Sequence, residues 1–371
     1  MEVKEKILIF HTALAPYRVD FFNAIDKEFD ASFYFSLKNV PSQKFDQDAI
    51  KRKCTFNSKY LLNGVDLFGY LIRTGVIRTV KKEKPDIILC NEYGPVTINV
   101  FLYKILFRKK FRFYTISDDS IDVSESRKGL RAFLRTTISK HIEGVIFTSK
   151  KVSDWYKNNI STRPKTLELP IIHNDTVFRD ELSMSLNSAN NNIRNYSLQG
   201  KKVLLFVGRL VTVKNLSFLL KVTAQLKSTD WVLIFVGDGI MIEALKNQAK
   251  ELNIVDKTIF VGRKEGPELT SWYTFAQIFV LPSTYEPFGA VVNEALLGGC
   301  KVLCSDVAGA SSLINSNNGK LFSPYNEKEL LTCIEETLTE VTPTPMTVNT
   351  IRENRMPFTF KEKIDTLTMN L

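Results

Sequence analysis

A short segment near the middle of the chain combines a glycine turn with two cations. Gly208 and Arg209 follow an apolar run, and Lys214 comes five residues after the arginine, where a helical pattern begins. The amides and dipole of a helix N-terminus attract anions, and arginine and lysine can neutralise a diphosphate. The segment therefore predicts a diphosphate site. The alternative is that both cations are solvated at the end of a strand.

Two glutamates lie eight positions apart in the segment YEPFGAVVNEALLGGC. Glu286 precedes a Pro-Phe-Gly turn, and Glu294 lies one turn into the helix expected after it. An ionised carboxylate accepts hydrogen bonds and can bind two hydroxyls of a ribose or pyranose. The pair predicts hydroxyl recognition. The alternative has Glu286 capping the helix and Glu294 in solvent.

Further candidate residues lie in the first half of the chain. Asp118 and Asp119 follow an expected strand, where two adjacent aspartates are most often structural or solvated. A metal site is the weaker interpretation, because no other ligand accompanies the pair. His11 ends the first expected strand, where it either contacts a ligand or is buried with a hydrogen bond.

The elements that must position these residues alternate regularly. Short apolar runs alternate with amphipathic stretches, which predicts βαβ units and parallel sheets. Ligands of such sheets bind at the carboxyl ends of the strands, where the candidate residues lie. The expected strands include Lys6–His11, Arg112–Ile116, Lys202–Val207, Trp231–Val236 and Lys301–Ser305.

The 371 residues, of which 44% are hydrophobic, are enough for two or three globular units. The pattern predicts two doubly wound, Rossmann-like α/β domains, at residues 1–173 and 201–357. The Asn- and Ser-rich segment 174–200 is interpreted as a linker between them. Residues 358–371 predict a short helix that packs back on the first domain, or a frayed tail.

All the excess positive charge lies in the first half. Residues 1–173 hold 30 Lys and Arg against 19 Asp and Glu, whereas residues 174–371 hold 20 against 21. Arg127, Arg131 and Arg135 recur at helical spacing between apolar residues, which favours a helix on an anionic membrane surface. A solvated basic face is the alternative. Nucleic acid is disfavoured because no stacking or groove-binding motif accompanies the charge.

Five scattered cysteines without a C-x-x-C pair are typical of a reduced, cytosolic protein. The first residues contain too short an apolar run for a signal peptide, and no stretch has the length of a membrane-spanning helix. We therefore expect a cytoplasmic protein that is peripheral at the inner face of the cytoplasmic membrane.

Several motifs occur in a fixed order through the second half. They are G-R-x4-K-N, VGDG, VG, E-P-F-G with its second glutamate, SD-x-x-G and NG. This order resembles retaining glycosyltransferase family 4, in particular bacterial capsule, O-antigen and lipopolysaccharide enzymes. The resemblance extends to the first half through APYRVDFFNAI at residues 15–25. It implies a GT-B fold, with a nucleotide sugar on the C-terminal domain and an acceptor on the N-terminal one.

The resemblance also implies roles for individual residues. Arg209 and Lys214 would hold the donor diphosphate beside Gly208, Glu294 would bind the ribose, and Glu286 would lie at the donor sugar. The rest of the donor site would consist of the segment around Arg263, which lines the base, and the backbone amides of Phe288, Gly289 and Ala290.

The chain departs from the family pattern in two places. Many relatives have a phosphate-binding glycine pair in the first loop, where this chain has Tyr17 and Arg18. Arg18 either substitutes by charge or lies on the surface, and His11, Tyr17 and Arg18 are candidate acceptor contacts. Many relatives also have a histidine where this chain has Asp118 and Asp119, and some lipopolysaccharide-type relatives have an aspartate there. The resemblance thus implies that Asp118 or Asp119 orients an acceptor or donor hydroxyl.

The expected activity is retaining, metal-independent transfer of a sugar from a nucleotide diphosphate to a lipid-linked glycan. A UDP-linked donor is favoured, and no cofactor is expected. The leaving phosphate would help to deprotonate the acceptor, with Glu286 as a covalent nucleophile the less favoured route. Two other interpretations are an inactive sugar-nucleotide-binding scaffold of polysaccharide assembly and a sugar-nucleotide epimerase on the same two-domain plan.

Overall fold

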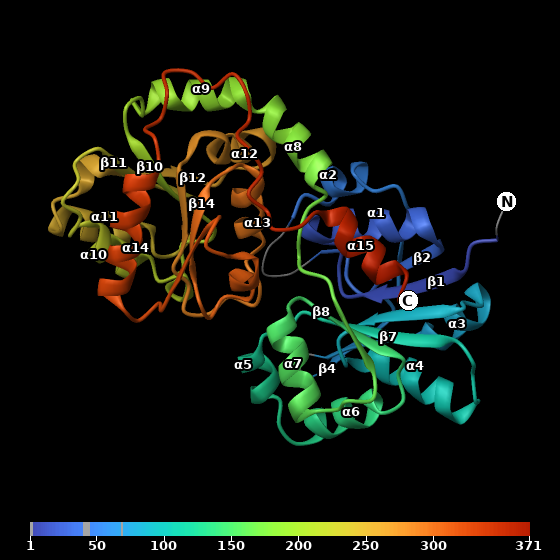
Figure 1. The fold of residues 1–371 in the computed structure, drawn as a ribbon. Helices are drawn as coiled ribbons and strands as arrows, with labels where there is room; N and C mark the ends of the chain where they lie inside the picture. Colours follow the sequence, from blue (N-terminus) through green and yellow to red (C-terminus); the bar gives the residue numbers. More distant parts are fainter. Residues whose placement is uncertain (1–2, 40–44, 68–69) are drawn as a thin grey trace. The chain divides into compact units, whose positions relative to one another are not determined.

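The computed structural model describes residues 3–39, 45–67 and 70–371. The chain divides into two compact units. Unit 1 consists of Met1–Ile171 and Lys361–Leu371, and unit 2 of Ile172–Phe360. Both are built on a parallel sheet with helices on its faces (Figure 1). Within the described residues, no helix has the length and apolar character needed to span a bilayer.

The sheet of unit 1 has the strand order β3-β2-β1-β6-β7-β8-β9, and all its pairs are parallel. After β3 the chain forms β4 and β5, which pair with each other as a separate antiparallel hairpin. The strands are β1 (Lys6–His11), β2 (Asp30–Phe35), β3 (Ser58–Tyr60), β4 (Gly64–Leu67), β5 (Tyr70–Arg73), β6 (Ile87–Asn91), β7 (Arg112–Ser117), β8 (Gly144–Phe147) and β9 (Lys165–Glu168).

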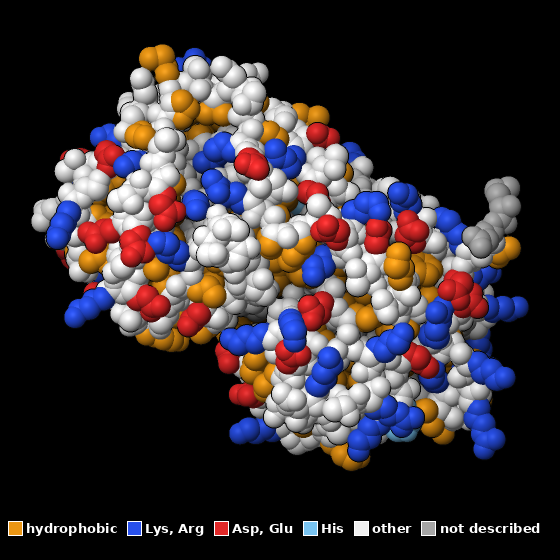
Figure 2. Space-filling model, viewed as in Figure 1, with side chains coloured by type: hydrophobic (Ala, Val, Ile, Leu, Met, Phe, Trp, Pro, Cys, Tyr) orange, Lys and Arg blue, Asp and Glu red, His pale blue; other side chains and the backbone are white. Residues whose placement is uncertain are grey.

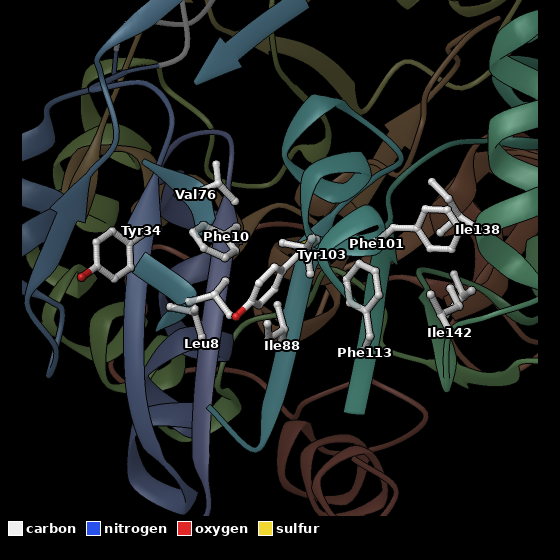
Figure 3. Close-up of a cluster of buried hydrophobic side chains, with 14 of the residues drawn as sticks. Leu8, Phe10, Tyr34, Val76, Ile88, Phe101, Tyr103, Phe113, Ile138 and Ile142 are labelled. Carbon is white, nitrogen blue, oxygen red and sulfur yellow. The ribbon is translucent and has the colours of Figure 1, made fainter. Parts of the chain in front are cut away.

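Helices cover this sheet and bury apolar side chains against it. They are α1 (Val19–Glu28), α2 (Gln47–Arg52), α3 (Val76–Glu83), α4 (Pro95–Leu106), α5 (Ile121–Ser126), α6 (Leu130–Ser139) and α7 (Lys150–Asn159). In Figure 3, Phe101 of α4 and Ile138 of α6 lie beside Phe113 of β7, within one buried cluster. Burial of such side chains on one face stabilises each helix against the sheet.

The C-terminal segment forms helix α15 (Phe360–Thr368). Residues 361–371 belong to unit 1. The Tyr114 hydroxyl of β7 donates to the carbonyl of Leu371 at 3.0 Å, and the side chains of Leu367 and Leu371 are buried. The end of the chain is therefore ordered against the first sheet.

Unit 2 repeats the architecture with the strand order β12-β11-β10-β13-β14-β15, again parallel. The strands are β10 (Lys202–Val207), β11 (Trp231–Val236), β12 (Thr258–Gly262), β13 (Ile278–Leu281), β14 (Lys301–Ser305) and β15 (Gly319–Phe322). The helices include α10 (Leu216–Thr223), α11 (Ile242–Glu251), α12 (Gly266–Phe275), α13 (Ala290–Leu297) and α14 (Glu327–Glu340).

The linker expected at residues 174–200 is wrong. The segment forms helices α8 (Asp175–Met184) and α9 (Leu186–Asn195), which pack on α12 within unit 2. The Asn174 side chain caps α8 by accepting from two backbone amides. Leu182 of α8 and Ile193 of α9 are buried. Each helix is therefore held by a few apolar residues on one face, although most of its other residues are polar.

The expected arginine stripe is also wrong. Arg127 precedes α6 and is ion-paired with Glu92 and Asp119. Arg135 is only 5% exposed, because its guanidinium donates to a backbone carbonyl and lies over the Trp155 ring. Arg131 alone of the three arginines is exposed. Helical spacing alone places the three arginines on one face, but Arg127 lies before the helix, Arg131 is exposed and Arg135 packs inward.

Candidate active site

The first strand of unit 2 ends in a tight turn that leads to Lys214. Gly208 has φ +150°, and its amide donates to the carbonyl of Val236 at the end of β11. The 3-10 turn Thr212–Lys214 follows, and its Val213 carbonyl accepts from the amide of Thr284, in the loop after β13, at 2.9 Å. The two loops are therefore fixed to each other at the carboxyl edge of the sheet.

This arrangement brings two of the candidate residues together. Lys214 Nζ donates to the Glu286 carboxylate, and the two side chains are 14% and 13% exposed. Removing two charges from water is costly unless they are paired, so each charge compensates for the burial of the other. Both side chains keep a small exposed fraction, so a polar ligand can still reach the pair. Glu286 therefore does not cap the helix that follows it.

Two glycines shape the turn after Glu286. Gly289 has φ +99°, a conformation that favours glycine, and it precedes α13 without offering a side-chain cap. Gly309 donates its amide to the carbonyl of Glu286, and a Cβ atom there would lie 2.2 Å from the carbonyl of Pro287. The SD-x-x-G motif is therefore explained by the close approach of two loops. Phe288 is buried, so only its backbone faces the turn.

Glu294 is held by two residues that the sequence did not single out. The Tyr273 hydroxyl donates to one carboxylate oxygen at 2.7 Å, and His173 Nε2 lies 3.4 Å from the other. The Glu294 side chain is 16% exposed, so the solvated alternative is wrong. Burial raises the pKa of Tyr273 well above its usual value. Sequence reasoning assigned nothing to His173, and no local signal marks Tyr273, which lies inside an apolar helix.

The other candidate residues of unit 2 lie at the same edge of the sheet but are exposed. Arg209 follows β10 directly, and Arg263 follows β12. Arg263 donates to Glu265 within its own loop. Ala290 is the first residue of α13 and is partly exposed. The structure places these residues at strand and helix ends without joining them to Lys214.

A second cluster lies at the carboxyl edge of the sheet in unit 1. Arg18 is 1% exposed and forms an ion pair with Asp118. The surface alternative for Arg18 is therefore wrong, and Tyr17 beside it is partly buried, which raises its pKa. Arg127 donates to Asp119 at 2.6 Å and to Glu92 at 3.3 Å. Glu92 is the residue of this cluster that the sequence analysis missed.

The two neighbouring aspartates differ in accessibility. The Asp118 side chain is 29% exposed, whereas that of Asp119 is 11% exposed. Burial raises the pKa of Asp119, while the Arg127 charge opposes that shift. Asp118 is therefore the carboxylate of the pair that a ligand reaches more easily.

His11 is buried, and its Nδ1 lies 3.0 Å from the carbonyl of Ala13. Its ring packs edge-on against Phe22 and Phe35. Burial, followed by the charge of Arg18, lowers the pKa of His11 to about 4, so the ring is neutral. Among the described residues, no group bonds to its buried Nε2. His11 is thus primarily part of the core, with one acceptor atom unused.

Comparison with known proteins finds similarity to glycosyltransferases. Residues 189–353 match the family model described as "Glycosyl transferases group 1". Over 142 residues, 38% of this chain, the sequence is 32% identical to an uncharacterized glycosyltransferase of Methanocaldococcus jannaschii. Over 131 residues, 35% of this chain, it is 33% identical to an N-acetylgalactosamine-N,N'-diacetylbacillosaminyl-diphospho-undecaprenol 4-alpha-N-acetylgalactosaminyltransferase of Campylobacter jejuni. The matches span only 36% and 35% of the length of these two relatives.

The fold is similar to that of a solved structure over nearly the whole chain. Anabaena HepE in complex with UDP aligns with a TM-score of 0.75 at 18% identity, covering 98% of this chain and 97% of that one. The expected α/β fold of two Rossmann-like, GT-B-type halves is thus confirmed, as is the resemblance of the second half to group 1 glycosyltransferases.

Proposed function

We propose that this chain, which carries a glycosyl transferases group 1 domain in its GT-B-type second half, is a glycosyltransferase that uses a nucleotide diphosphate sugar. The observation that carries the proposal is the largely buried ion pair of Lys214 and Glu286. Glu286 lies in the turn before α13, whose start has no side-chain cap. Cations, free amides and a carboxylate at one strand edge suit a diphosphate that is joined to a sugar.

In the proposed reaction, charge develops on the donor next to Lys214, Arg209 and Glu286. Cleavage of the bond between sugar and diphosphate leaves positive charge at the anomeric carbon and negative charge on the departing phosphate. Lys214 and Arg209 stabilise the phosphate as its charge grows, and the first amides of α13 add to that effect. Glu294 accepts from ribose hydroxyls while Tyr273 holds it in place.

We further propose that the sugar is transferred with retention and without a metal ion. Glu286 already neutralises Lys214, so it is better suited to orient a sugar hydroxyl than to attack carbon. The departing phosphate can instead take the proton of the acceptor hydroxyl on the same face. Lys214 and Arg209 supply the positive charge, and full activity in excess EDTA is the expected outcome.

For the donor, we favour UDP-linked sugars. The supporting observation is the similarity in fold to Anabaena HepE in complex with UDP. For the acceptor, we favour a lipid-linked glycan bound by unit 1, because the Campylobacter relative is named for a diphospho-undecaprenol acceptor. Asp118, Arg18 and Tyr17 form the polar edge of unit 1 that would meet acceptor hydroxyls.

An anionic membrane surface fits unit 1 through a wider set of exposed residues, of which only Arg131 belongs to the expected arginine stripe. Six large apolar side chains of α4, α6 and their flanks are 43–72% exposed, and six exposed cations surround them. Figure 2 shows Lys and Arg side chains over this part of unit 1. We name this set the basic apolar face: Leu102, Ile105, Leu106, Phe107, Leu130 and Phe133, with Arg108, Lys109, Lys110, Lys128, Arg131 and Lys140. Such a face suits the cytoplasmic leaflet.

Donor hydrolysis tests the proposed activity without a known acceptor. Purified protein is incubated with UDP-, GDP- and ADP-sugars, and release of the nucleoside diphosphate is measured. Slow release that Lys214→Ala abolishes supports the transferase. Lys202→Ala is the matched control, because Lys202 pairs with Asp230 at the opposite end of β10. Nucleotide binding without any turnover would favour a scaffold, and an altered free sugar nucleotide would favour an epimerase.

A further inference from the structure

Glu92 has a backbone conformation that residues other than glycine seldom adopt. It directly follows β6 with φ +57°. Such strain persists only where the surroundings impose it, and it often marks functional positions. The Glu92 amide donates to the carbonyl of Ile116 in β7 at 2.8 Å, and its carbonyl accepts from the Thr97 hydroxyl at 2.8 Å. The residue is thus fixed to both a neighbouring strand and helix α4.

The side chain of Glu92 connects two loops. One carboxylate oxygen accepts the backbone amide of Asp118 at 2.8 Å, and the other accepts from Arg127 at 3.3 Å. The same guanidinium donates to Asp119. A glycine would tolerate the positive φ without any of these contacts. The contacts themselves therefore explain why a glutamate is useful here.

Glu92 lies among two further carboxyl groups, those of Asp118 and Asp119. Burial raises the pKa of Glu92 to about 8, the charges of Asp119 and Asp118 add to the shift, and Arg127 opposes it. A pKa near 8 means that the Glu92 carboxyl group is mostly protonated at neutral pH and ionises as the pH rises above 8. The ionisable groups that face Glu92 and its partners are Arg18, Tyr93, Asp118, Asp119, Arg127 and Arg135.

We propose that Glu92 is a positioning residue for Asp118: it holds the Asp118 amide and Arg127, so that Asp119 is turned inward and Asp118 faces the acceptor. The inference rests on the proposed glycosyl transfer, in which Asp118 orients an acceptor hydroxyl. It assigns the two neighbouring aspartates different tasks. Asp119 forms the ion pair with Arg127 that supports the loop, and Asp118 orients the acceptor hydroxyl.

Three variants test this assignment. Glu92→Gly suits the positive φ and removes the side chain, so a loss of function would not reflect backbone strain. Glu92→Gln keeps an acceptor for the Asp118 amide and cannot ionise. Glu143→Gln is the matched control, because Glu143 also accepts from a backbone amide, that of Phe113, and from a lysine, Lys104, but at the start of β7.

Two measurements are made on each variant between pH 6 and 9. One is hydrogen exchange of the Asp118 amide, and the other is UDP release from UDP-glucose, in which water takes the place of the acceptor hydroxyl that Asp118 orients. We expect Glu92→Gly to exchange at least about tenfold faster and to lose about 100-fold in turnover, with unchanged affinity for UDP. Wild-type turnover should fall above about pH 8, as the extra negative charge repels Asp118. Glu92→Gln should keep turnover at pH 7 and lose that decline, and Glu143→Gln should behave as the wild type.

Unchanged exchange in Glu92→Gly, or turnover within twofold of the wild type, would overturn the assignment. A wild type that releases UDP from no donor would contradict the proposed function instead. The exchange measurement would then still decide whether Glu92 holds Asp118. A Glu92→Gln variant that keeps the decline above pH 8 would show that another group causes it, which also contradicts the inference.

Discussion

Lys214 and Glu286 lie 72 positions apart in the chain, yet their side chains form an ion pair at the carboxyl edge of one parallel sheet. Each comes from a different loop, and the hydrogen bond from Thr284 to Val213 fixes the two loops to each other. A nucleotide sugar that binds here would meet a cation and an acid already in place. Such preorganisation is where enzymes obtain much of their electrostatic stabilisation.

Replacing Lys214 by alanine should lower turnover about 100-fold, since one cation on a developing charge contributes on the order of 3 kcal/mol. Arg209→Ala should lower turnover in the same direction. The rate of nucleoside diphosphate release from UDP-sugars measures both effects. If neither substitution changes the rate, the diphosphate does not bind at these residues.

Removing the Tyr273 hydroxyl should weaken donor binding more than it slows turnover. Tyr273→Phe leaves Glu294 without its shortest hydrogen bond, which contributes about 1.5–3 kcal/mol when the acceptor is charged. We expect a higher Kd for UDP in a calorimetric titration and a kcat that changes little. Glu294→Ala should have the same effect to a greater extent. A selective loss of kcat would show that the carboxylate takes part in the chemical step.

A methyl group at position 309 should displace the turn that carries Glu286. The added Cβ in Gly309→Ala would lie 2.2 Å from a backbone oxygen, which cannot move away as a flexible side chain would. Overpacking of this kind costs about 1–3 kcal/mol. We expect a lower Tm and weaker UDP binding, whereas Gly94→Ala tests a glycine of negative φ whose added Cβ would meet nothing within 4 Å. Equal UDP affinities in the two variants would contradict this role for the turn.

His11 should make the protein sensitive to acid. Its pKa is about 4 in the folded protein and 6.5 in the unfolded chain, so the unfolded state binds more protons between these values. The contribution of neutral His11 to the free energy of unfolding is fully present above pH 6.5 and is lost as the pH falls to about 4. His11→Asn keeps a group that can bond to the carbonyl of Ala13 but does not titrate. Thermal unfolding should show a smaller loss of Tm between pH 6.5 and 4 in this variant, and equal losses would contradict the shift.

The basic apolar face should bind vesicles that contain anionic lipid. Phe107→Ser and Phe133→Ser should each weaken binding about tenfold, because partial insertion of a phenylalanine contributes ~1.5 kcal/mol. Added salt should weaken binding further. Ile240→Ser is the control, since Ile240 is an exposed apolar side chain of unit 2. Sedimentation that is unaffected by salt and by both phenylalanine substitutions would contradict the proposed membrane contact.

The main strands were predictable from local pattern. Those at Lys6–His11, Lys202–Val207, Trp231–Val236 and Lys301–Ser305 have the predicted bounds. Parallel strands are buried on both faces, so they appear as continuous apolar runs that need no alternation to be recognised. The segment 174–200 was not predictable in the same way, because its helices bury only a few of their residues and expose a polar remainder.

The sequence by itself determined the alternation of strands and helices and the presence of Arg209, Lys214, Glu286 and Glu294 beside strand or helix ends. These features follow from residue type and short spacing, and both are local. Only the tertiary structure decided which side chains interact. Arg127 packs inward and donates to Asp119, and the Tyr273 hydroxyl donates to Glu294. Such partners are brought together by strand order and by the packing of helices on a sheet, and neither is encoded in the spacing of nearby residues.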